Sequence, residues 1–261
     1  MMSDTLNSSL HTIPTHSGNI HAQLWHSDKP NTPIVLMHDS LGSVQQWRDF
    51  PAQLAAHTGR SVLAYDRVGY GQSQPFPGKQ PLSFIADEAL VFEQVYAHFG
   101  LHDFVIYGHS VGGPISAVIA AHFPNSCRAL MTEASQAFVE AKTLAGIRAA
   151  EAFFSQPTHF AKLAKYHGDK TEWVLRSWID NWLDPAFANW QVSQYVGVVS
   201  CPILSLHGEV DEYGSTAQAQ RYQQLSKQDN QVVILPECGH FPHKQQTEQV
   251  LNHVAAFLAD K

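Results

Sequence analysis

Ser110 stands between two glycines, Gly108 and Gly112, directly after a run of apolar residues. A serine flanked in this way, where a strand passes into a helix, sits on a tight turn that raises its hydroxyl above the edge of a sheet. Glycines are needed there because the turn leaves no room for side chains beside the serine. Such a hydroxyl can attack a carbonyl carbon once a base takes its proton. The sequence therefore predicts Ser110 as a nucleophile.

A base and an orienting acid follow Ser110 in the chain. His240 comes after a glycine on a short loop that follows the last apolar run, and we predict it as the base. Asp211 lies on the loop after the preceding apolar run, and its carboxylate can accept the N–H of the histidine ring and fix the tautomer. Glu133, at the end of an earlier run, is the second candidate for the acid. His243 is the nearest alternative to His240, with packing of the loop or pocket as its expected role.

Two backbone N–H groups are candidates for stabilising the negative oxygen that forms during such an attack. Val111 follows the nucleophile at the start of a helix, so its N–H is free to point at the reacting group. The second donor usually comes from an early loop, and we predict the N–H of Ser40. Asp39, beside it, would disfavour an anion unless its carboxylate points away or is paired.

The elements that must position these residues alternate between apolar runs and helical patterns. Strands are expected at 33–38, 61–65, 104–107, 129–132, 202–206 and 231–235, after a leading antiparallel hairpin of 11–14 and 19–25. Helices are expected at 46–57, 82–99, 111–122, 215–225 and 246–259. Runs that are apolar almost throughout are typical of strands covered on both faces. We predict an α/β fold with a doubly wound, mostly parallel sheet.

The segment 136–199 interrupts this alternation, since it has no good strand and is rich in aromatic residues. We interpret it as a helical cap over one end of the sheet, so that 1–135 and 200–261 form the core. Trp178 and Trp182 are four residues apart and share a helix face. Together with His109 and Tyr166 they are our candidates for binding substrate.

Composition excludes several classes of function. Hydrophobic residues make up 44% of the 261 residues, charged residues 15%, and the formal net charge is −7, with no basic cluster that would suit nucleic acid. Three cysteines without metal-ligand spacing indicate neither a disulfide framework nor a zinc site. We expect no metal and no organic cofactor. Without a signal-like start or a membrane-length apolar run, we expect a cytoplasmic protein with no membrane partner.

Taken in order, these motifs resemble the α/β-hydrolase superfamily over about residues 10–258, and in particular its small capped members related to esterases and lactonases. The matching pieces are His38-Asp39-x-x-Gly42, Asp66-Arg67-x-Gly69-x-Gly71-x-Ser73, Gly108-x-Ser110-x-Gly112-Gly113, Gly208-x-x-Asp211 and Gly239-His240. One departure is that the early loop usually begins His-Gly, where this chain has His38-Asp39. A serine nucleophile also separates the chain from the dehalogenases and epoxide hydrolases of this fold, which use aspartate.

We therefore expect a serine hydrolase that cleaves a small carboxylic ester or lactone through an acyl-enzyme on Ser110. The cap has few basic residues near the expected pocket, which disfavours a strongly anionic substrate. The same triad could instead serve a lyase, a C–C bond hydrolase or a perhydrolase, because fold alone does not separate these reactions. A ligand sensor on the same scaffold would have no need of all three residues. The sequence leaves the physiological substrate and the oligomeric state open.

Overall fold

A single eight-stranded sheet forms the centre of the computed structural model, which describes residues 7–261, in the order β1-β2-β4-β3-β5-β6-β7-β8. Pairing is antiparallel between β1 and β2 and between β2 and β4, and parallel from β4 to β8. This confirms the predicted hairpin and the mostly parallel sheet. The strands are β1 Ser8–Thr15, β2 Gly18–Trp25, β3 Ile34–Met37, β4 Val62–Tyr65, β5 Phe104–His109, β6 Cys127–Glu133, β7 Ile203–Gly208 and β8 Asn230–Leu235.

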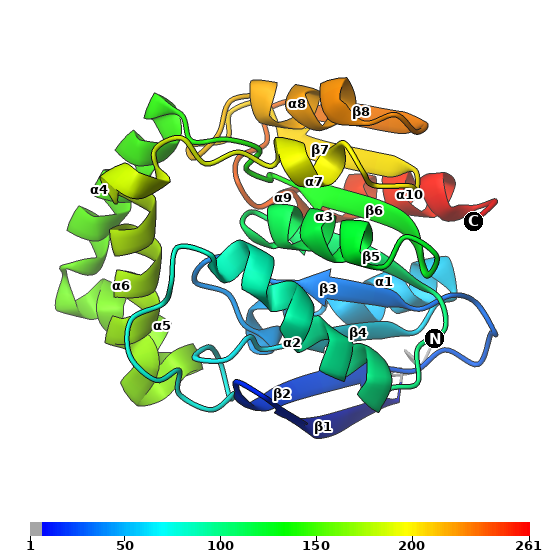
Figure 1. Cartoon of the computed structure of the whole chain (residues 1–261), viewed down its shortest axis with the longest axis horizontal. Coiled ribbons are helices and arrows are strands. Elements are labelled where there is room, and N and C mark those ends of the chain that lie inside the picture. Colours follow the sequence, from blue (N-terminus) through cyan, green and yellow to red (C-terminus); the bar gives the residue numbers. More distant parts are fainter. Residues whose placement is uncertain (1–6) are drawn as a thin grey trace.

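Helices lie on both faces of the sheet, as expected for a doubly wound fold (Figure 1). On one face α1 packs against α10, and on the other α2, α3, α7 and α8 follow one another. The α-helices are α1 Phe50–Thr58, α2 Phe84–His98, α3 Gly112–His122, α4 Ala141–Phe154, α5 Pro157–His167, α6 Thr171–Trp182, α7 Ser193–Val196, α8 Ala217–Leu225, α9 Pro242–Gln245 and α10 Thr247–Leu258. Short 3₁₀ helices lie at Val44–Trp47, Gly168–Lys170 and Pro185–Phe187.

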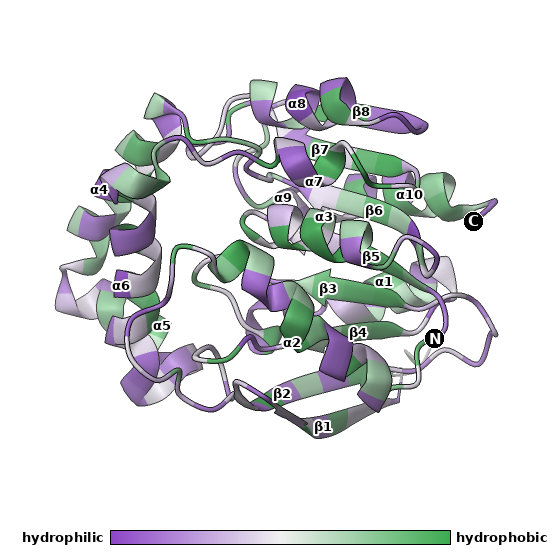
Figure 2. Cartoon of the chain, in the orientation of Figure 1, coloured by the Kyte–Doolittle hydropathy of each residue, from purple (hydrophilic) through white to green (hydrophobic). Residues whose placement is uncertain are grey.

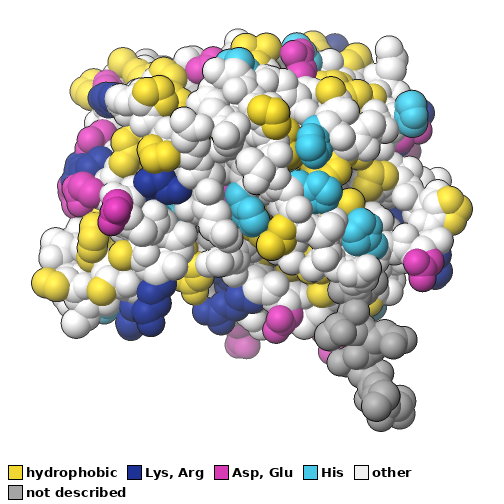
Figure 3. Space-filling model, turned by 90° about the horizontal axis from the view of Figure 1, so that it is seen from below, with side chains coloured by type: hydrophobic (Ala, Val, Ile, Leu, Met, Phe, Trp, Pro, Cys, Tyr) yellow, Lys and Arg dark blue, Asp and Glu magenta, His cyan; other side chains and the backbone are white. Residues whose placement is uncertain are grey.

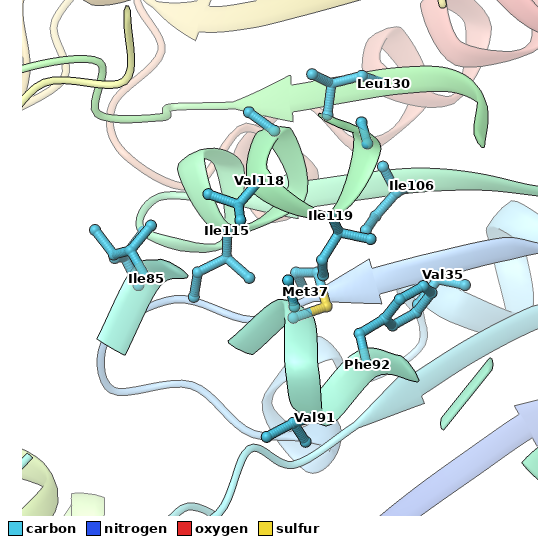
Figure 4. Packing of buried hydrophobic residues seen from close by; sticks show 14 of the residues in the cluster. Val35, Met37, Ile85, Val91, Phe92, Ile106, Ile115, Val118, Ile119 and Leu130 are labelled. Atoms are coloured by element: carbon cyan, nitrogen blue, oxygen red, sulfur yellow. The ribbon is translucent and has the colours of Figure 1, made fainter. Parts of the chain in front are cut away.

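Alternate residues of the central strands serve two separate hydrophobic cores. On β5, Ile106 faces the core under α2 and α3, whereas Val105 and Tyr107 face the core under α1 and α10. Because both faces of the sheet are covered here, every residue of β3 and β5 is buried, and Figure 2 shows β3 in the green of hydrophobic residues. Figure 4 shows the first of these cores, where side chains from α2 and α3 meet those of the sheet.

The helix predicted at 46–57 is wrong at its start. A 3₁₀ turn over Val44–Trp47 comes first, and α1 begins only at Phe50. Arg48, between them, has a positive φ of 53°, which a continuous helix cannot contain. Pro51 lies in the first turn of α1, where proline is tolerated, and so marks the true start. The short helix α9 is a further element that the sequence did not reveal.

The segment predicted as a cap separates into two groups of helices. Helices α4, α5 and α6 contact one another and stand together beyond one end of the sheet (Figure 1). Helix α7, by contrast, packs against α3 and α8 of the core. The part of 136–199 that stands apart from the sheet thus ends before α7. Across residues 7–261, none of the helices combines the length and apolar character that a membrane crossing requires.

Histidine side chains gather on the face of the molecule seen in Figure 3, which β1, β2 and α2 help to form. The rings of His11 and His98 lie with centroids 5.8 Å apart. Partial burial and the neighbouring histidines lower the pKa of His11.

Candidate active site

The turn that carries Ser110 joins β5 to α3 and has the strained geometry expected from its glycines. Ser110 has a φ of +56°, in the left-handed region that side chains rarely adopt. A Cβ on Gly108 would lie 2.1 Å from the carbonyl oxygen of Gly112, and a Cβ on Gly112 would lie 2.1 Å from that of Met37. Both positions therefore require glycine, because backbone on the next segment occupies the space.

Gly112→Ala is expected to destabilise the fold, because the new methyl group would collide with the backbone of β3. Forced overpacking of this kind costs about 1–3 kcal/mol, or more where the neighbour is backbone. Urea unfolding at pH 7 measures the change. Gly197→Ala is the matched control, since its Cβ would lie 3.3 Å from the nearest atom. A Gly112→Ala protein with the same urea midpoint as the wild type would contradict the prediction.

Ser110, His240 and Asp211 form a continuous chain of hydrogen bonds. The Nε2 atom of His240 lies 3.0 Å from the Oγ atom of Ser110. On the other side of the ring, Nδ1 lies 2.9 Å from both carboxylate oxygens of Asp211. Ser110 and His240 are each 5% exposed, and Asp211 is fully buried. The structure thus brings together the three residues predicted from the sequence, at distances that allow a proton to pass from serine to histidine.

The loop after β7 holds Asp211 as an anion. Its Oδ1 accepts hydrogen bonds from the backbone N–H groups of Tyr213, at 2.7 Å, and Gly214, at 3.2 Å. Burial by itself raises the pKa of this carboxyl, but the hydrogen bond and charge of His240 outweigh it and hold the pKa below its ordinary value. The end of β7 packs closely against the loop that carries His240. A Cβ on Gly208 would lie within 2.3 Å of the carbonyl oxygens of Cys238 and Gly239, so only glycine fits there.

The early loop between β3 and α1 brings Ser40 to the same place. Ser40 and Ser110 line one cavity together. The hydrogen bonds of residues 7–261 use neither the N–H of Ser40 nor that of Val111. Both groups remain available as donors to an oxygen at Ser110, as the predicted pair requires.

Two joined cavities open beside Ser110 and His240. The larger measures about 530 Å³ and the smaller about 220 Å³, and Trp178 and Tyr213 line both of them. Trp182 lines only the smaller cavity. The remaining side chains of the larger cavity are mainly apolar and include Leu41, Phe154, Leu163 and Phe241. An uncharged substrate with an apolar part fits this lining.

Two predicted substrate-binding residues lie away from these cavities. Tyr166 does not line either one, since the inward-facing residues of α5 are Leu163 and His167. His109 is buried and lines neither cavity, and its ring Nε2 bonds to the carbonyl oxygen of His240. We therefore correct the prediction for both residues and keep Trp178 and Trp182.

Comparison with known proteins agrees with this fold. A family model described as the alpha/beta hydrolase fold matches residues 32–151. The crystal structure of proline iminopeptidase from Mycobacterium smegmatis superposes with a TM-score of 0.74 over 96% of this chain and 98% of that one, at 22% identity. The chain has the α/β-hydrolase fold.

Two curated relatives match the chain over shorter segments. It is 35% identical over 104 residues to pimeloyl-[acyl-carrier protein] methyl ester esterase of Proteus mirabilis, which covers 40% of this chain and 36% of that protein. It is 28% identical over 117 residues to a probable serine hydrolase of Drosophila melanogaster, which covers 44% and 34% respectively. The chain thus spans about a third of the length of these two relatives.

Asp39, the departure from the usual early loop of the α/β-hydrolases, is paired rather than free. Its Oδ1 accepts the N–H of Leu41 at 2.7 Å, and its Oδ2 lies 3.4 Å from Nδ1 of His109. Burial raises the pKa of Asp39, but the hydrogen bond and charge of His109 outweigh it and hold the pKa well below its ordinary value. The contact with His109 thus turns one oxygen of Asp39 toward a ring N–H, which limits the repulsion that Asp39 exerts on an oxyanion.

His109 joins three loops of the site. Besides Asp39 on the early loop, its Nε2 donates to the carbonyl oxygen of His240 at 2.7 Å. Burial lowers the pKa of His109, but its contact with Asp39 and the charge of Glu133 outweigh this and raise it. The residue next to the nucleophile thus positions the base, which explains its place in the site better than substrate binding does.

Glu133, the second candidate for the acid, has a different partner. Its Oε1 accepts hydrogen bonds from both the backbone N–H of His243, at 3.0 Å, and the ring Nδ1 of His243, at 2.6 Å, and its Oε2 accepts from Tyr107. His109, Glu133 and His243 offer ligand atoms within 4.8 Å of one another, as a metal site would. Because these hydrogen bonds already account for Glu133 and His243, we interpret the group as structural.

Glu133→Gln is expected to make the free energy of unfolding depend less on pH in the acidic range. Burial raises the pKa of Glu133, but the charge and hydrogen bond of His243 outweigh it and lower the pKa from 4.5 to about 2. A carboxyl with a depressed pKa stabilises the fold above pH 4.5 and loses that contribution as pH falls toward 2, here about 3 kcal/mol. Urea unfolding between pH 7 and pH 3 should therefore show the two proteins converging in acid. A gap that stays constant with pH would contradict this, and Glu248→Gln serves as the exposed control.

One residue of the site was missed at the level of sequence. The Oγ atom of Ser110 lies 3.3 Å from Oε1 of Gln136, which is buried three residues beyond the end of β6 and lines the smaller cavity. The signal that could have identified it is its place after a parallel strand next to β5, since the carboxyl ends of such strands meet at one edge. The sequence analysis assigned Gln136 to the start of the cap instead.

Proposed function

We propose that this protein is a serine hydrolase that cleaves a small carboxylic ester or lactone through an acyl-enzyme on Ser110. The observation that carries the proposal is the hydrogen-bonded chain Ser110–His240–Asp211, with distances of 3.0 and 2.9 Å. Relatives whose names state esterase or serine hydrolase activity support it.

In the first half of the reaction, Ser110 Oγ attacks the carbonyl carbon while its proton passes to Nε2 of His240. The carbonyl oxygen becomes an oxyanion, which the N–H groups of Ser40 and Val111 stabilise. The C–O bond to the leaving group then breaks, and His240 returns the proton to the departing alkoxide, so that an alcohol leaves. With a lactone, that alcohol remains attached to the acyl group.

In the second half, His240 takes a proton from water as the water oxygen attacks the acyl carbon. The bond to Ser110 Oγ breaks, the proton returns to the serine, and a carboxylic acid is released. Asp211 stays ionised throughout and stabilises the imidazolium that forms twice. The low pKa of its carboxyl is consistent with that role.

Labelling with a fluorescent fluorophosphonate tests the nucleophile directly, because this reagent forms a covalent bond only with an activated serine. We expect one adduct, located on Ser110 by peptide mass spectrometry, and none in Ser110→Ala. A folded wild-type protein that remains unlabelled would overturn the proposal.

A panel of substrates then separates esters from amides. 4-Nitrophenyl acetate, butyrate and octanoate test acyl length, γ-butyrolactone tests a ring ester, and proline 4-nitroanilide tests the proline iminopeptidase reaction named for a structural relative. We expect turnover of the esters and the lactone to exceed that of the anilide. Preference for the anilide would replace the ester proposal with a peptidase. As a setting we propose the cytoplasm, since the three cysteines are free thiols.

A further inference from the structure

A second cavity of about 680 Å³ lies between α2, the β1–β2 turn and the loop after β4. None of its lining residues lines the two cavities at Ser110. Much of its wall is apolar, with Val68, Phe84 and Val91 buried and Phe76 half-buried. Figure 4 shows Val91 on α2, away from the sheet residues that the same helix covers. The cavity is partly open to solvent and can hold a small organic molecule against its apolar wall.

Two buried groups of opposite charge also line this cavity. Arg67 is 2% exposed, its guanidinium lies 4.2 Å from the centre of the Tyr70 ring, and its Nε–H has no hydrogen-bond partner among residues 7–261. Glu88 is 8% exposed and accepts a hydrogen bond from Tyr65 on Oε1 only. Both side chains line the cavity, so its wall includes a guanidinium donor and a carboxyl acceptor that a ligand could use.

The charges around the cavity select against ionic ligands. A carboxylate would meet Arg67 but would also face Glu88 and the exposed Asp87 at the rim. An ammonium group would meet Glu88 but would also face Arg67. A hydroxyl or carboxamide can accept from Arg67 and donate to Glu88 at the same time. Burial raises the pKa of Glu88 to about 7, which further reduces any attraction for a cation at neutral pH.

We propose that this cavity is a second binding site, for an uncharged amphipathic molecule with an apolar body and a carboxamide or hydroxyl head. The head group lies between Arg67 and Glu88, and the body lies against Phe76, Phe84 and Val91. Nothing in the reaction at Ser110 uses these residues.

The site is connected to the reaction centre through Arg67 and through the cap. Arg67 Nη2 donates to the carbonyl oxygen of Asp39 at 3.1 Å, next to the oxyanion donor Ser40. On the other side, Phe76 stacks on Trp173 of α6, with ring centroids 5.5 Å apart. Helix α6 also carries Trp178 and Trp182, which line the active site. A molecule in the second cavity is therefore linked to the active site through Arg67 on one side and through α6 on the other. If the proposed function holds, its binding is expected to change turnover.

Binding is tested with three probes of the same shape: phenylacetamide, phenylacetate and phenethylamine. Titrations followed by ¹H–¹⁵N NMR on Ser110→Ala exclude any turnover and do not depend on the proposed function. We expect phenylacetamide to bind about tenfold more tightly than either charged probe, with shifts centred on α2 and the loop after β4. Equal affinities, or shifts confined to the cavities at Ser110, would overturn the proposal.

Three further variants fix the site. Leu90→Trp, at a half-exposed position on the cavity wall, is expected to weaken binding of phenylacetamide at least about tenfold, whereas Leu10→Trp, on an exposed part of β1, leaves it unchanged. Glu88→Gln keeps the shape but removes the charge, so phenylacetate should then approach the affinity of the amide. Should Glu88→Gln not fold, Asp87→Asn at the rim tests the same charge effect. Binding that none of the cavity variants alters would overturn the assignment.

Steady-state kinetics tests separately whether binding in the second cavity affects the reaction at Ser110. Saturating phenylacetamide is expected to change kcat for 4-nitrophenyl butyrate at least about twofold in the wild type and not in Leu90→Trp. A pure rise in KM that persists in Leu90→Trp would mean competition at Ser110 and would overturn the connection. If the protein hydrolyses no ester, the proposed function fails, while the NMR result still decides the second site.

Discussion

Ser110→Ala is expected to lower kcat for a cleavable ester on the order of 10⁵-fold or more, because the acyl-enzyme can no longer form. What remains should be the slow attack of water assisted by the oxyanion donors. KM is expected to change little, since the substitution removes only one hydroxyl from a cavity that is lined mainly by other residues. Steady-state kinetics with 4-nitrophenyl butyrate at pH 7.5 measures both constants.

Ser116→Ala is the matched control for this prediction. Ser116 is a fully buried serine on α3, the helix that follows Ser110, and its Oγ has no hydrogen-bond partner among residues 7–261. Its removal is expected to leave kcat within about twofold of the wild type. If Ser110→Ala kept more than a tenth of the activity, another residue would have to carry the reaction.

The parts of the site that follow from a local rule could be predicted from the sequence. Ser110 and Asp211 each follow an apolar strand, and parallel strands bring their carboxyl ends to one edge of the sheet. His240 is placed by the next such strand, β8. Order along the chain and turn residues were therefore sufficient to select one histidine among 16.

The groups that connect these residues could not be predicted in the same way. His109 contacts Asp39 and the carbonyl of His240, which lie far from it in the chain, and no periodicity reports such a contact. Tyr166 was assigned to the pocket by its type, although Leu163 of the same helix is the residue that lines it. Within a helical cap the pattern gives the buried face but not what that face covers.

The second cavity could not be predicted from the sequence either. Arg67 belongs to the motif that begins with Asp66, and Asp66 shapes its loop by accepting the N–H groups of Val44 and Gln72. Only packing against α2 brings Arg67 close to Glu88. A motif can therefore be structural at one residue and line a binding cavity at the next.

Asp211→Asn is expected to lower kcat on the order of 10⁴-fold while leaving the fold intact, as the equivalent change does in a serine-protease triad. The reason is that the side-chain amide of the asparagine can place only its NH₂ group toward Nδ1 of His240. Oδ1 of Asp211 accepts two backbone N–H groups, from Tyr213 and Gly214, so the asparagine oxygen is held there. Its NH₂ group then takes the place of Oδ2, 2.9 Å from Nδ1 of His240.

An NH₂ group at that position can only donate, so Nδ1 of His240 must accept and its proton moves to Nε2. A protonated Nε2 cannot take the proton of Ser110, which removes the base without removing the histidine. Fluorophosphonate labelling of Ser110 should therefore persist but slow in parallel with kcat, whereas an unfolded protein would not label at all. Glu209→Gln, on the same loop but outside the triad, is expected to retain wild-type rates. Labelling of Asp211→Asn at the wild-type rate would show that the carboxylate does not set the tautomer of His240.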